Sequence, residues 1–439
     1  MVNMNNKDAF TEVSVFWFRR DLRLEDNVGL MNALKGGLPV LPLFIFDDEI
    51  LDSLSRNDAR VSFLHSCLEK VNLQLKLKGS SLLVKKGSVK EVWKELIEKY
   101  DIKNVFFNKD YEPYAIARDK ALSEMLNSKS IATYKFKDQV VFEENDILKA
   151  DGKPYTVYTP YKNKWLKLFE ITPVKPEADE EKGFDNLYKF DSAFPSLASI
   201  GFSKSDIEVL PYNLDNLSEY EVNRDYPATN GTSFLSPHLR FGVISIRRLV
   251  EQVKNRNQVF LSELIWREFF MQILFHFPGV VTNNFKRKYD GIQWRNNPAE
   301  FKRWCEGNTG YPLVDAGMRE LNETGYMHNR VRMVTASFLC KHLLMDWKLG
   351  EAYFAEKLLD YELSSNNGNW QWAAGTGCDA APYFRVFNPT LQLKKFDKDV
   401  KYTRKWIPEF DFGYSEPMVD HAFARERCLS VYKEGLASI

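Results

Sequence analysis

The first 130 residues alternate two kinds of apolar pattern. Runs of strand length lie at 13–18, 38–46, 81–85 and 103–108. Stretches with helical spacing lie around 27–34, 60–77, 89–100 and 115–126. Strands that alternate with helices predict an α/β fold with a doubly wound parallel sheet, Rossmann-like in class. No G-x-G-x-x-G follows the first run, where residues 19–27 read RRDLRLEDN, so a dinucleotide bound to the sheet in the usual manner is not predicted.

The alternation stops near residue 135, and the rest of the chain has a different pattern. With 439 residues the chain is too long for one ordinary core, so two domains are expected. Residues from about 140 to 215 are rich in Pro, Gly and acidic side chains and have little periodicity, which is typical of a connector. After residue 230 apolar residues recur at helical spacings. We therefore predict an α/β domain at 11–135, a connector at 136–215 and an all-α domain at 216–439.

Charge and cysteine content exclude several classes of protein. Lysine plus arginine (60) equals aspartate plus glutamate (60), which argues against non-specific coating of nucleic acid but leaves room for a local basic patch. No apolar run approaches the roughly 20 residues of a membrane helix, and the start lacks the pattern of a signal peptide. Five cysteines without a C-x-x-C motif predict reduced thiols in a cytoplasmic protein. Six histidines without H-x-x-x-H spacing predict no metal site.

Residues 366–389 contain an unusual pair of tryptophans in the sequence NNGNWQWAAGTGCDAAPYFRVFNP. Trp370 and Trp372 follow Asn-Asn-Gly, which predicts a turn at 366–368. On a helix, residues two apart lie about 200° apart around the axis, so the two indoles are expected to face different environments.

A second motif precedes the helical domain, between Arg224 and Pro237. Ser236 followed by Pro237 predicts the start of a helix. The hydroxyl groups of Thr232 and Ser233 exceed what capping requires. The motif is therefore either a simple cap or a phosphate site at a helix N-terminus.

Two further motifs lie in helical patterns. Glu263 and Trp266 are three residues apart in LSELIWREFF and share one face of a helix, as do Arg330 and Met333 in MHNRVRM. These residues are either an ordinary helix surface over the core or members of a binding site. Basic segments at 286–288 and 394–405 contain aromatic residues and are either solvated or follow a phosphate backbone.

Together these motifs resemble the DNA photolyase/cryptochrome flavoproteins, and within them the bacterial-type (class I) cyclobutane pyrimidine dimer photolyases. The motifs GTSFLSP, LSELIWREFF, TGYMHNRVRM and the 366–389 segment are long and contiguous. The resemblance runs from FWFRRDLRLEDN to the YKEGL tail and is weakest in the connector. It implies an N-terminal antenna domain and a C-terminal all-α FAD-binding domain.

The resemblance also implies a U-shaped FAD in the helical domain, with the reduced anion FADH⁻ as the working state. The residues implied for FAD binding are Tyr220, Arg224, Thr232, Ser233, Leu235, Ser236, Arg267, Asn329, Arg332, Asp360, Glu362 and Asn366. Among them, residues 232–236 and Arg267 would approach the phosphates. Arg332 would pair with Asp360 beside the isoalloxazine, and Asn366 would face flavin N5.

Two further groups of residues follow from the same resemblance. Trp370, Trp347 and Trp294 would form an electron chain that ends near the surface and photoreduces an oxidised flavin. The residues implied for substrate binding are Glu263, Trp266, Asn329, Arg330, Met333 and Trp372. A flipped-out pyrimidine dimer in DNA would accept an electron from the excited reduced flavin, while Glu263 hydrogen-bonds or protonates a dimer carbonyl.

Three alternatives to a monomeric dimer photolyase remain open. A blue-light cryptochrome is disfavoured by Asn366, where plant cryptochromes tend to have aspartate, and by the short tail. A (6-4) photolyase is disfavoured because His328 is followed by Asn329 and not by the His pair of those enzymes. The third alternative is an aromatic-rich nucleic-acid-binding protein without catalysis.

A second, antenna chromophore is also open. Folate-antenna members carry an Asn-Glu pair that is absent from YEPYAIARD at 111–119. A deazaflavin, a flavin nucleotide, a folate held differently and no antenna all remain compatible with the sequence.

Overall fold

The computed structural model describes residues 11–172, 176, 181–229 and 231–438. The chain divides into two compact units. The first comprises Met1–Val141, Val174–Asp206 and His238–Leu249, and the second comprises Phe142–Pro173, Ile207–Pro237 and Val250–Ile439. Within the described residues, no helix has the length and apolar character needed to cross a membrane.

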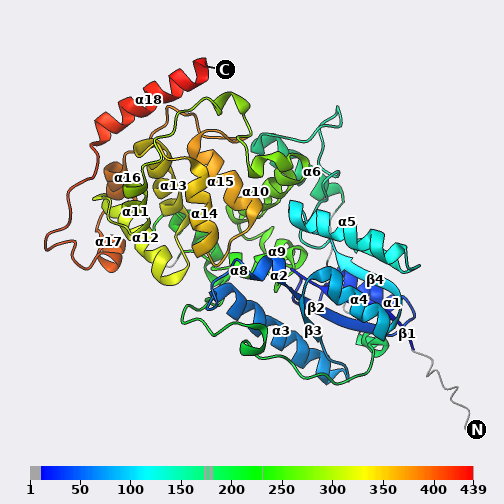
Figure 1. Cartoon of the computed structure of the whole chain (residues 1–439). Helices are drawn as coiled ribbons and strands as arrows, with labels where there is room; N and C mark the ends of the chain where they lie inside the picture. Colours follow the sequence, from blue (N-terminus) through cyan, green and yellow to red (C-terminus); the bar gives the residue numbers. More distant parts are fainter. Residues whose placement is uncertain (1–10, 173–175, 177–180, 230, 439) are drawn as a thin grey trace, which may run out of the picture. The chain divides into compact units, whose positions relative to one another are not determined.

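The first unit is built on a five-stranded parallel sheet (Figure 1). Its strands are β1 (Glu12–Phe18), β2 (Val40–Asp47), β3 (Leu83–Gly87), β4 (Asp101–Asn108) and β5 (Ala132–Phe136). The order is β3-β2-β1-β4-β5, with Val15 of β1 opposite Leu41 of β2 and Val105 of β4. Strands β1 to β4 match the four predicted apolar runs and confirm the predicted sheet. The fifth was not predicted, because this short edge strand has no fully buried residue and lacks a strong apolar run.

Helices cover both faces of the sheet. They are α1 (Val28–Lys35), α2 (Asp48–Leu51), α3 (Ala59–Leu77), α4 (Val89–Lys99) and α5 (Pro113–Asn127). Successive strand residues point to opposite faces, so Phe16 and Phe18 of β1 pack in one core with α1 and α3. Trp17 packs in the other core with α4 and α5. This two-faced burial explains why the strands read as continuous apolar runs, and it confirms the doubly wound class.

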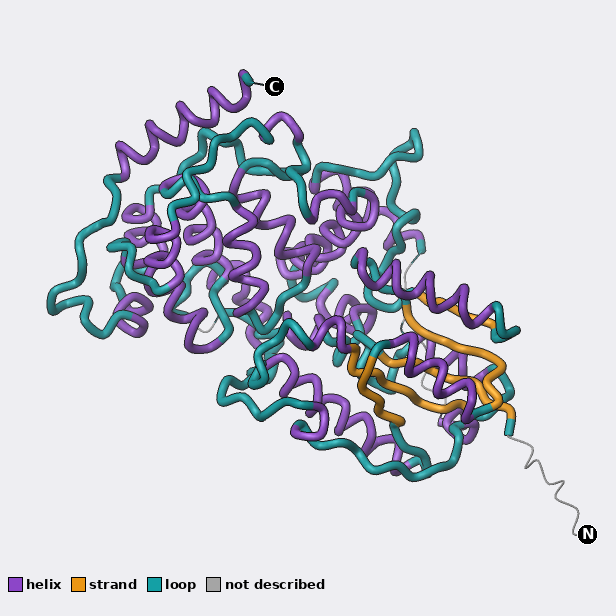
Figure 2. Tube along the Cα trace, in the orientation of Figure 1, coloured by secondary structure: helices purple, strands orange, loops and turns teal. Residues whose placement is uncertain are grey.

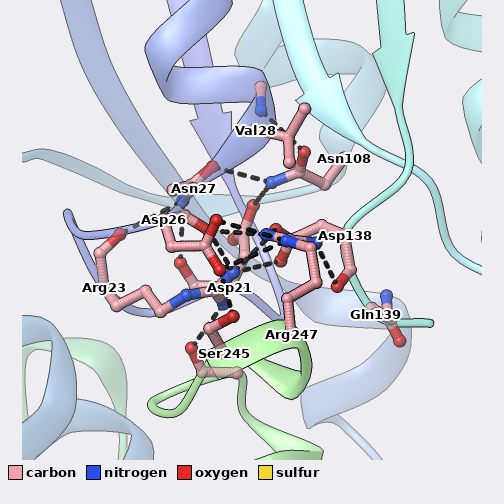
Figure 3. Close-up of polar contacts among 12 residues, drawn as sticks. Asp21, Arg23, Asp26, Asn27, Val28, Asn108, Asp138, Gln139, Ser245 and Arg247 are labelled. Atoms are coloured by element: carbon pink, nitrogen blue, oxygen red, sulfur yellow. Dashed lines mark hydrogen bonds and ion pairs between the residues drawn. The ribbon is translucent and has the colours of Figure 1, made fainter. Parts of the chain in front are cut away.

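The RRDLRLEDN motif forms a buried polar network beyond the end of β1 (Figure 3). Asp138 accepts hydrogen bonds from Arg23 (2.6 Å) and Arg247 (2.8 Å). Asp26 accepts from Arg247 at 3.2 Å and from the hydroxyl of Ser245. Burial acts to raise the pKa of Asp138, but the two guanidinium groups outweigh it and the pKa is lowered. The motif therefore has a structural function, joining segments that are far apart in the sequence.

Asp21 gives this network an excess negative charge. It accepts from the amide of Arg19 (2.7 Å) and from Asn108 (2.6 Å), and it is 2% exposed. Burial, and then the charge of Asp138, raise the pKa of Asp21 from 3.8 to about 6. The folded state thus favours the protonated carboxyl.

The stability of the first unit should consequently depend on pH through Asp21. Because the folded pKa lies above the unfolded value, this group stabilises the fold most below pH 4, and its contribution falls as pH rises to about 6. A change of this size corresponds to roughly 3 kcal/mol. The measurement is hydrogen exchange of the β1 amides, corrected for intrinsic exchange rates. Between pH 4.5 and 7, the wild type should lose protection relative to the variant Asp21→Asn. The half-buried Asp101, whose side chain is 39% exposed, serves as the control in the variant Asp101→Asn. Parallel curves for Asp21→Asn and wild type would contradict the prediction.

After β5 the regular structure is helical (Figure 2), which confirms the prediction for the residues after 230. Its helices are α6 (Tyr158–Ile171), α7 (Tyr220–Asn223), α8 (Ser236–Arg240), α9 (Ile246–Val253), α10 (Gln258–His276), α11 (Pro298–Cys305), α12 (Pro312–Thr324), α13 (Asn329–Ser337), α14 (Trp347–Lys357), α15 (Leu363–Ala374), α16 (Pro389–Phe396), α17 (Lys401–Trp406) and α18 (His421–Ala437). The core of the second unit includes residues of α12, α13, α14 and α15.

Helix α6 lies in the segment that the sequence analysis interpreted as connector. Pro160 suggests a break, but it occupies the first turn of α6, where a helix tolerates proline. Trp165 of α6 donates its indole N–H to the buried carboxylate of Glu268 at 2.7 Å, and the amide of Phe142 donates to the same oxygen at 3.2 Å. Glu268 on α10 thus anchors the segment to the second unit. The domain boundaries at 135/136 and 215/216 stay predictions.

The turn predicted at Asn366-Asn367-Gly368 is wrong, because these residues lie inside α15. The side chain of Asn367 donates to the carbonyl of Val280 at 3.0 Å, which removes the competition that an asparagine usually offers to a helix. A Cβ on Gly368 would lie 2.2 Å from the ring of Phe270. Tertiary contact therefore selects both the glycine and the helical conformation.

Candidate functional site

Two arginine–carboxylate pairs connect the helices of the second unit. Arg332 on α13 donates to both oxygens of Asp360, at 3.2 and 3.0 Å, and its Nε donates to the carbonyl of Met327. Arg267 on α10 pairs with Glu362, the residue before α15, at 3.5 Å. The first pair is the one that the sequence resemblance implied.

Asn366 lies on α15 and is 9% exposed. Its side-chain amide donates to the carbonyl of Glu351 at 3.0 Å and to the Glu351 carboxyl at 2.8 Å. Burial raises the pKa of Glu351. Glu351 was not predicted as a site residue because its helix, α14, ends before the 366–389 motif begins, and only the tertiary structure brings the two side chains together.

The short segment after α7 pairs with two of the predicted substrate residues. Arg224 donates to Glu263 on α10 at 2.6 Å, and Arg330 on α13 donates to Asp225 at 2.7 Å. Arg330 also lies over the ring of Phe396, 4.3 Å from its centroid. Asp225 was missed because nothing in the sequence distinguishes it from other surface carboxylates.

Trp266 lies one turn after Glu263 on α10. Tyr158 stacks on the Trp266 ring with centroids 3.5 Å apart and planes 8° from parallel. The hydroxyl of Tyr158 donates to the carbonyl of Ser262 at 2.7 Å. Burial, and then the charge of Glu263, raise the pKa of Tyr158. One face of the indole is therefore covered by this chain's own tyrosine.

The tryptophans of the predicted electron chain share one apolar cluster. Trp370 and Trp347 are buried in it and Trp294 is half-buried against it. Trp347 donates its indole N–H to Asn284 at 2.8 Å. A Cβ on Gly350 would lie 2.1 Å from the Trp370 ring, so only glycine permits this contact between α14 and α15.

Trp372 is half-buried, whereas Trp370 is 2% exposed. The two indoles thus occupy different environments on α15, as the helical geometry predicted. Glu351, Asp225 and Tyr158 are the neighbours that the sequence analysis did not find.

The predicted phosphate-binding segment lies immediately before α8. Leu235 is buried, Thr232 and Ser233 are half-buried, and α8 begins at Ser236, which confirms the predicted helix start. Tyr220 packs on Phe260 with ring centroids 5.0 Å apart. Asn329 is exposed at the start of α13, and Met333 lies one turn later, 3.8 Å from the Arg330 guanidinium.

Comparison with known proteins places this chain in a family. Residues 260–412 match the model for the FAD binding domain of DNA photolyase, and residues 14–180 match the DNA photolyase model. The deoxyribodipyrimidine photo-lyase of Escherichia coli is 36% identical over 95% of this chain and 98% of its own, and that of Synechococcus is 34% identical over 97% of both. This chain belongs to the photolyase/cryptochrome family.

Solved structures of the family have the same fold. The structure of a class III photolyase from Agrobacterium tumefaciens aligns over 100% of this chain and 100% of its own. It is 33% identical and has a TM-score of 0.85. An archaeal photolyase from Sulfolobus tokodaii with two FAD molecules is 34% identical, covers 96% of this photolyase-family chain and 99% of its own, and has a TM-score of 0.84. The fold is also shared with a Synechocystis cryptochrome, 24% identical and with a TM-score of 0.85.

Proposed function

We propose that this protein is a deoxyribodipyrimidine photo-lyase, which uses light to repair cyclobutane pyrimidine dimers in DNA. The observation that carries the assignment is identity of 34–36% with enzymes of that name along at least 95% of the chain. The predicted lesion residues Glu263, Trp266 and Arg330 add support, since they supply an acid, an aromatic face and a cation. A flipped-out base needs such stacking surfaces and hydrogen-bonding groups.

FAD fits the residues that α10, α13 and α15 bring together. The Arg267 guanidinium and the hydroxyls before α8 suit a pyrophosphate, which has several acceptor oxygens. The hydroxyl oxygen of Ser364, between Glu362 and Asn366, is buried and has no hydrogen-bond partner among the described residues. An unpaired buried polar atom of this kind is expected where a bound molecule completes the site. We propose that FAD, when bound in its reduced form, supplies the photoexcited electron for dimer cleavage.

The residues of this chain bind and orient the reactants. We assign to Arg332, held by Asp360, and to Asn366, held by Glu351, the positioning of the flavin ring. Trp372 and Trp266 would stack against the flipped dimer. Glu263, which accepts from Arg224 at 2.6 Å in this structure, would donate a hydrogen bond to a dimer carbonyl in its protonated form and so stabilise negative charge that develops there.

Trp370, Trp347 and Trp294 would serve a separate process, the photoreduction of an enzyme that holds oxidised FAD. Their indoles lie in or against one apolar cluster. Repair by an enzyme that is already reduced does not require this chain of indoles.

Asn329 favours dimers over (6-4) photoproducts as the substrate, since a (6-4) photolyase would carry the histidine pair near this position. Under blue light, the FAD-loaded protein should restore an oligonucleotide with one thymine dimer and leave the same oligonucleotide with a (6-4) photoproduct unchanged, as measured by chromatography. Repair of the (6-4) product alone would reject the assignment, and repair of neither lesion would favour a cryptochrome.

We further propose a monomeric, cytoplasmic enzyme with an α/β antenna domain at 11–135, a connector at 136–215 and a FAD-binding domain at 216–439. Five free cysteines support a reducing compartment. Light scattering tests the monomer. The two FAD molecules of the Sulfolobus relative make a flavin the first antenna candidate, and the absorption spectrum of the native protein distinguishes it from a folate or a deazaflavin.

A further inference from the structure

Only some of the hydrogen-bond donors of the Arg330 guanidinium have a good acceptor. One terminal nitrogen donates to Asp225 at 2.7 Å, and the other meets only the sulfur of Met333 at 3.8 Å, a weak acceptor. Its Nε is buried without any hydrogen-bond partner among the described residues. The guanidinium therefore retains donors that an anion with two or three oxygens would satisfy better than Asp225 does.

A second cation lies beside the aromatic ring that Arg330 contacts. The Arg330 guanidinium lies 4.3 Å from the centroid of the Phe396 ring, and the Lys395 ammonium lies 5.1 Å from the same centroid. Two cations thus lie beside one aromatic ring, and Asp225 is the carboxylate paired with Arg330. Such an arrangement attracts a further anion.

The Asp225–Arg330 pair is also easy to open. The Asp225 side chain is 39% exposed, whereas that of Arg330 is 19% exposed. Asp225 follows the four-residue helix α7 and belongs to no helix itself. Partly exposed ion pairs contribute only about 0.2–1 kcal/mol, so displacement of Asp225 costs little.

We propose that Asp225 is an internal substitute for a DNA phosphate. In the DNA-free protein it occupies Arg330, and a phosphodiester of the bound strand displaces it and takes both terminal nitrogens of the guanidinium. Asp225 then weakens DNA binding in general and keeps Arg330 in place until DNA arrives. This inference rests on the proposed DNA-repair function, and it adds a residue that limits affinity.

The test is dark binding of a fluorescent thymine-dimer oligonucleotide to the FAD-loaded full chain, measured by anisotropy from 50 to 200 mM salt. Asp225→Asn should tighten binding about two- to fivefold. The slope of log affinity against log salt should change by much less than about 0.9, the value for one phosphate contact, because the same phosphate meets Arg330 in both complexes. Arg330→Gln should weaken binding and abolish the effect of Asp225→Asn in the double variant. Glu356→Gln, which opens an exposed pair with Lys357, is the matched control for the loss of one negative charge and should change neither quantity.

Two results would overturn the proposal. Weaker or unchanged binding by Asp225→Asn would mean that Asp225 orients Arg330 and does not compete with DNA. If Asp225→Asn tightened DNA binding equally in the Arg330→Gln variant, the effect would come from the change in net charge and not from competition for Arg330. Failure of the proposed function is distinguishable from both, since the wild-type protein would then show no preference for the dimer oligonucleotide over its undamaged counterpart.

Discussion

Trp370→Phe is expected to slow photoreduction of oxidised FAD more than about tenfold, equivalent to at least 1.4 kcal/mol of barrier. The indole lies 2% exposed in the apolar cluster that also contains Trp347, and phenylalanine is a much poorer electron donor. Repair by enzyme reduced beforehand with dithionite should stay within about twofold of wild type, because the reduced flavin needs no electron from Trp370. Flash photolysis measures the first quantity and dimer repair measures the second.

Trp304→Phe is the matched control for this variant. Trp304 is equally buried, packs edge-on against Trp370 with centroids 6.1 Å apart, and lies outside the proposed electron chain. Both substitutions leave a cavity of similar size, which costs about 1–3 kcal/mol of stability. If both variants slowed photoreduction equally, Trp370 would have no specific role in electron transfer to the flavin. Loss of repair by pre-reduced Trp370→Phe would show that the two indoles of α15 are not divided as proposed.

Asp360→Asn is expected to raise the dissociation constant of FAD about 100-fold, equivalent to about 2.7 kcal/mol. The substitution removes the charge that Arg332 meets through two hydrogen bonds, while the shape of the side chain is kept. The Asp360 side chain is 10% exposed, so water replaces the lost carboxylate poorly. The effect is measured by dialysis, as the fluorescence of the FAD that leaves the protein.

Asp411→Asn provides the control for loss of such a pair. Asp411 also meets an arginine, Arg404, through two hydrogen bonds, but both side chains are about half exposed. It should retain FAD like wild type. Retention of FAD by Asp360→Asn would contradict the assignment of the Arg332–Asp360 pair to the cofactor site.

The elements of the first unit could be predicted because burial alone determines them. Strands of a parallel sheet covered on both faces must be apolar throughout, as VSVFWF of β1 is, and this pattern is visible without any tertiary information. Strand β5 lacks the pattern because it has no fully buried residue, whereas the other edge strand, β3, begins at the buried Leu83 and was predicted. Local composition thus predicts buried strands better than partly exposed ones.

The helical unit was predictable in class, but its decisive contacts were not. Asn366-Asn367-Gly368 has the composition of a turn, and its helical conformation depends on Val280, Glu351 and Phe270, which come from three other segments. The pair of Arg330 with Asp225 joins residues 105 apart in the sequence and has no periodic signal. By contrast, the Arg332–Asp360 pair was predicted, because the resemblance to the family implies it.

The central claim is that this chain uses light to split pyrimidine dimers. The most direct measurement is the ultraviolet absorbance of thymine in a dimer-containing oligothymidylate that is mixed with the protein in its fully reduced FAD state. The account predicts that absorbance rises under blue light, stays constant in the dark, and stays constant in the light without protein. No rise in the light, with FAD fully reduced and DNA bound, would contradict it.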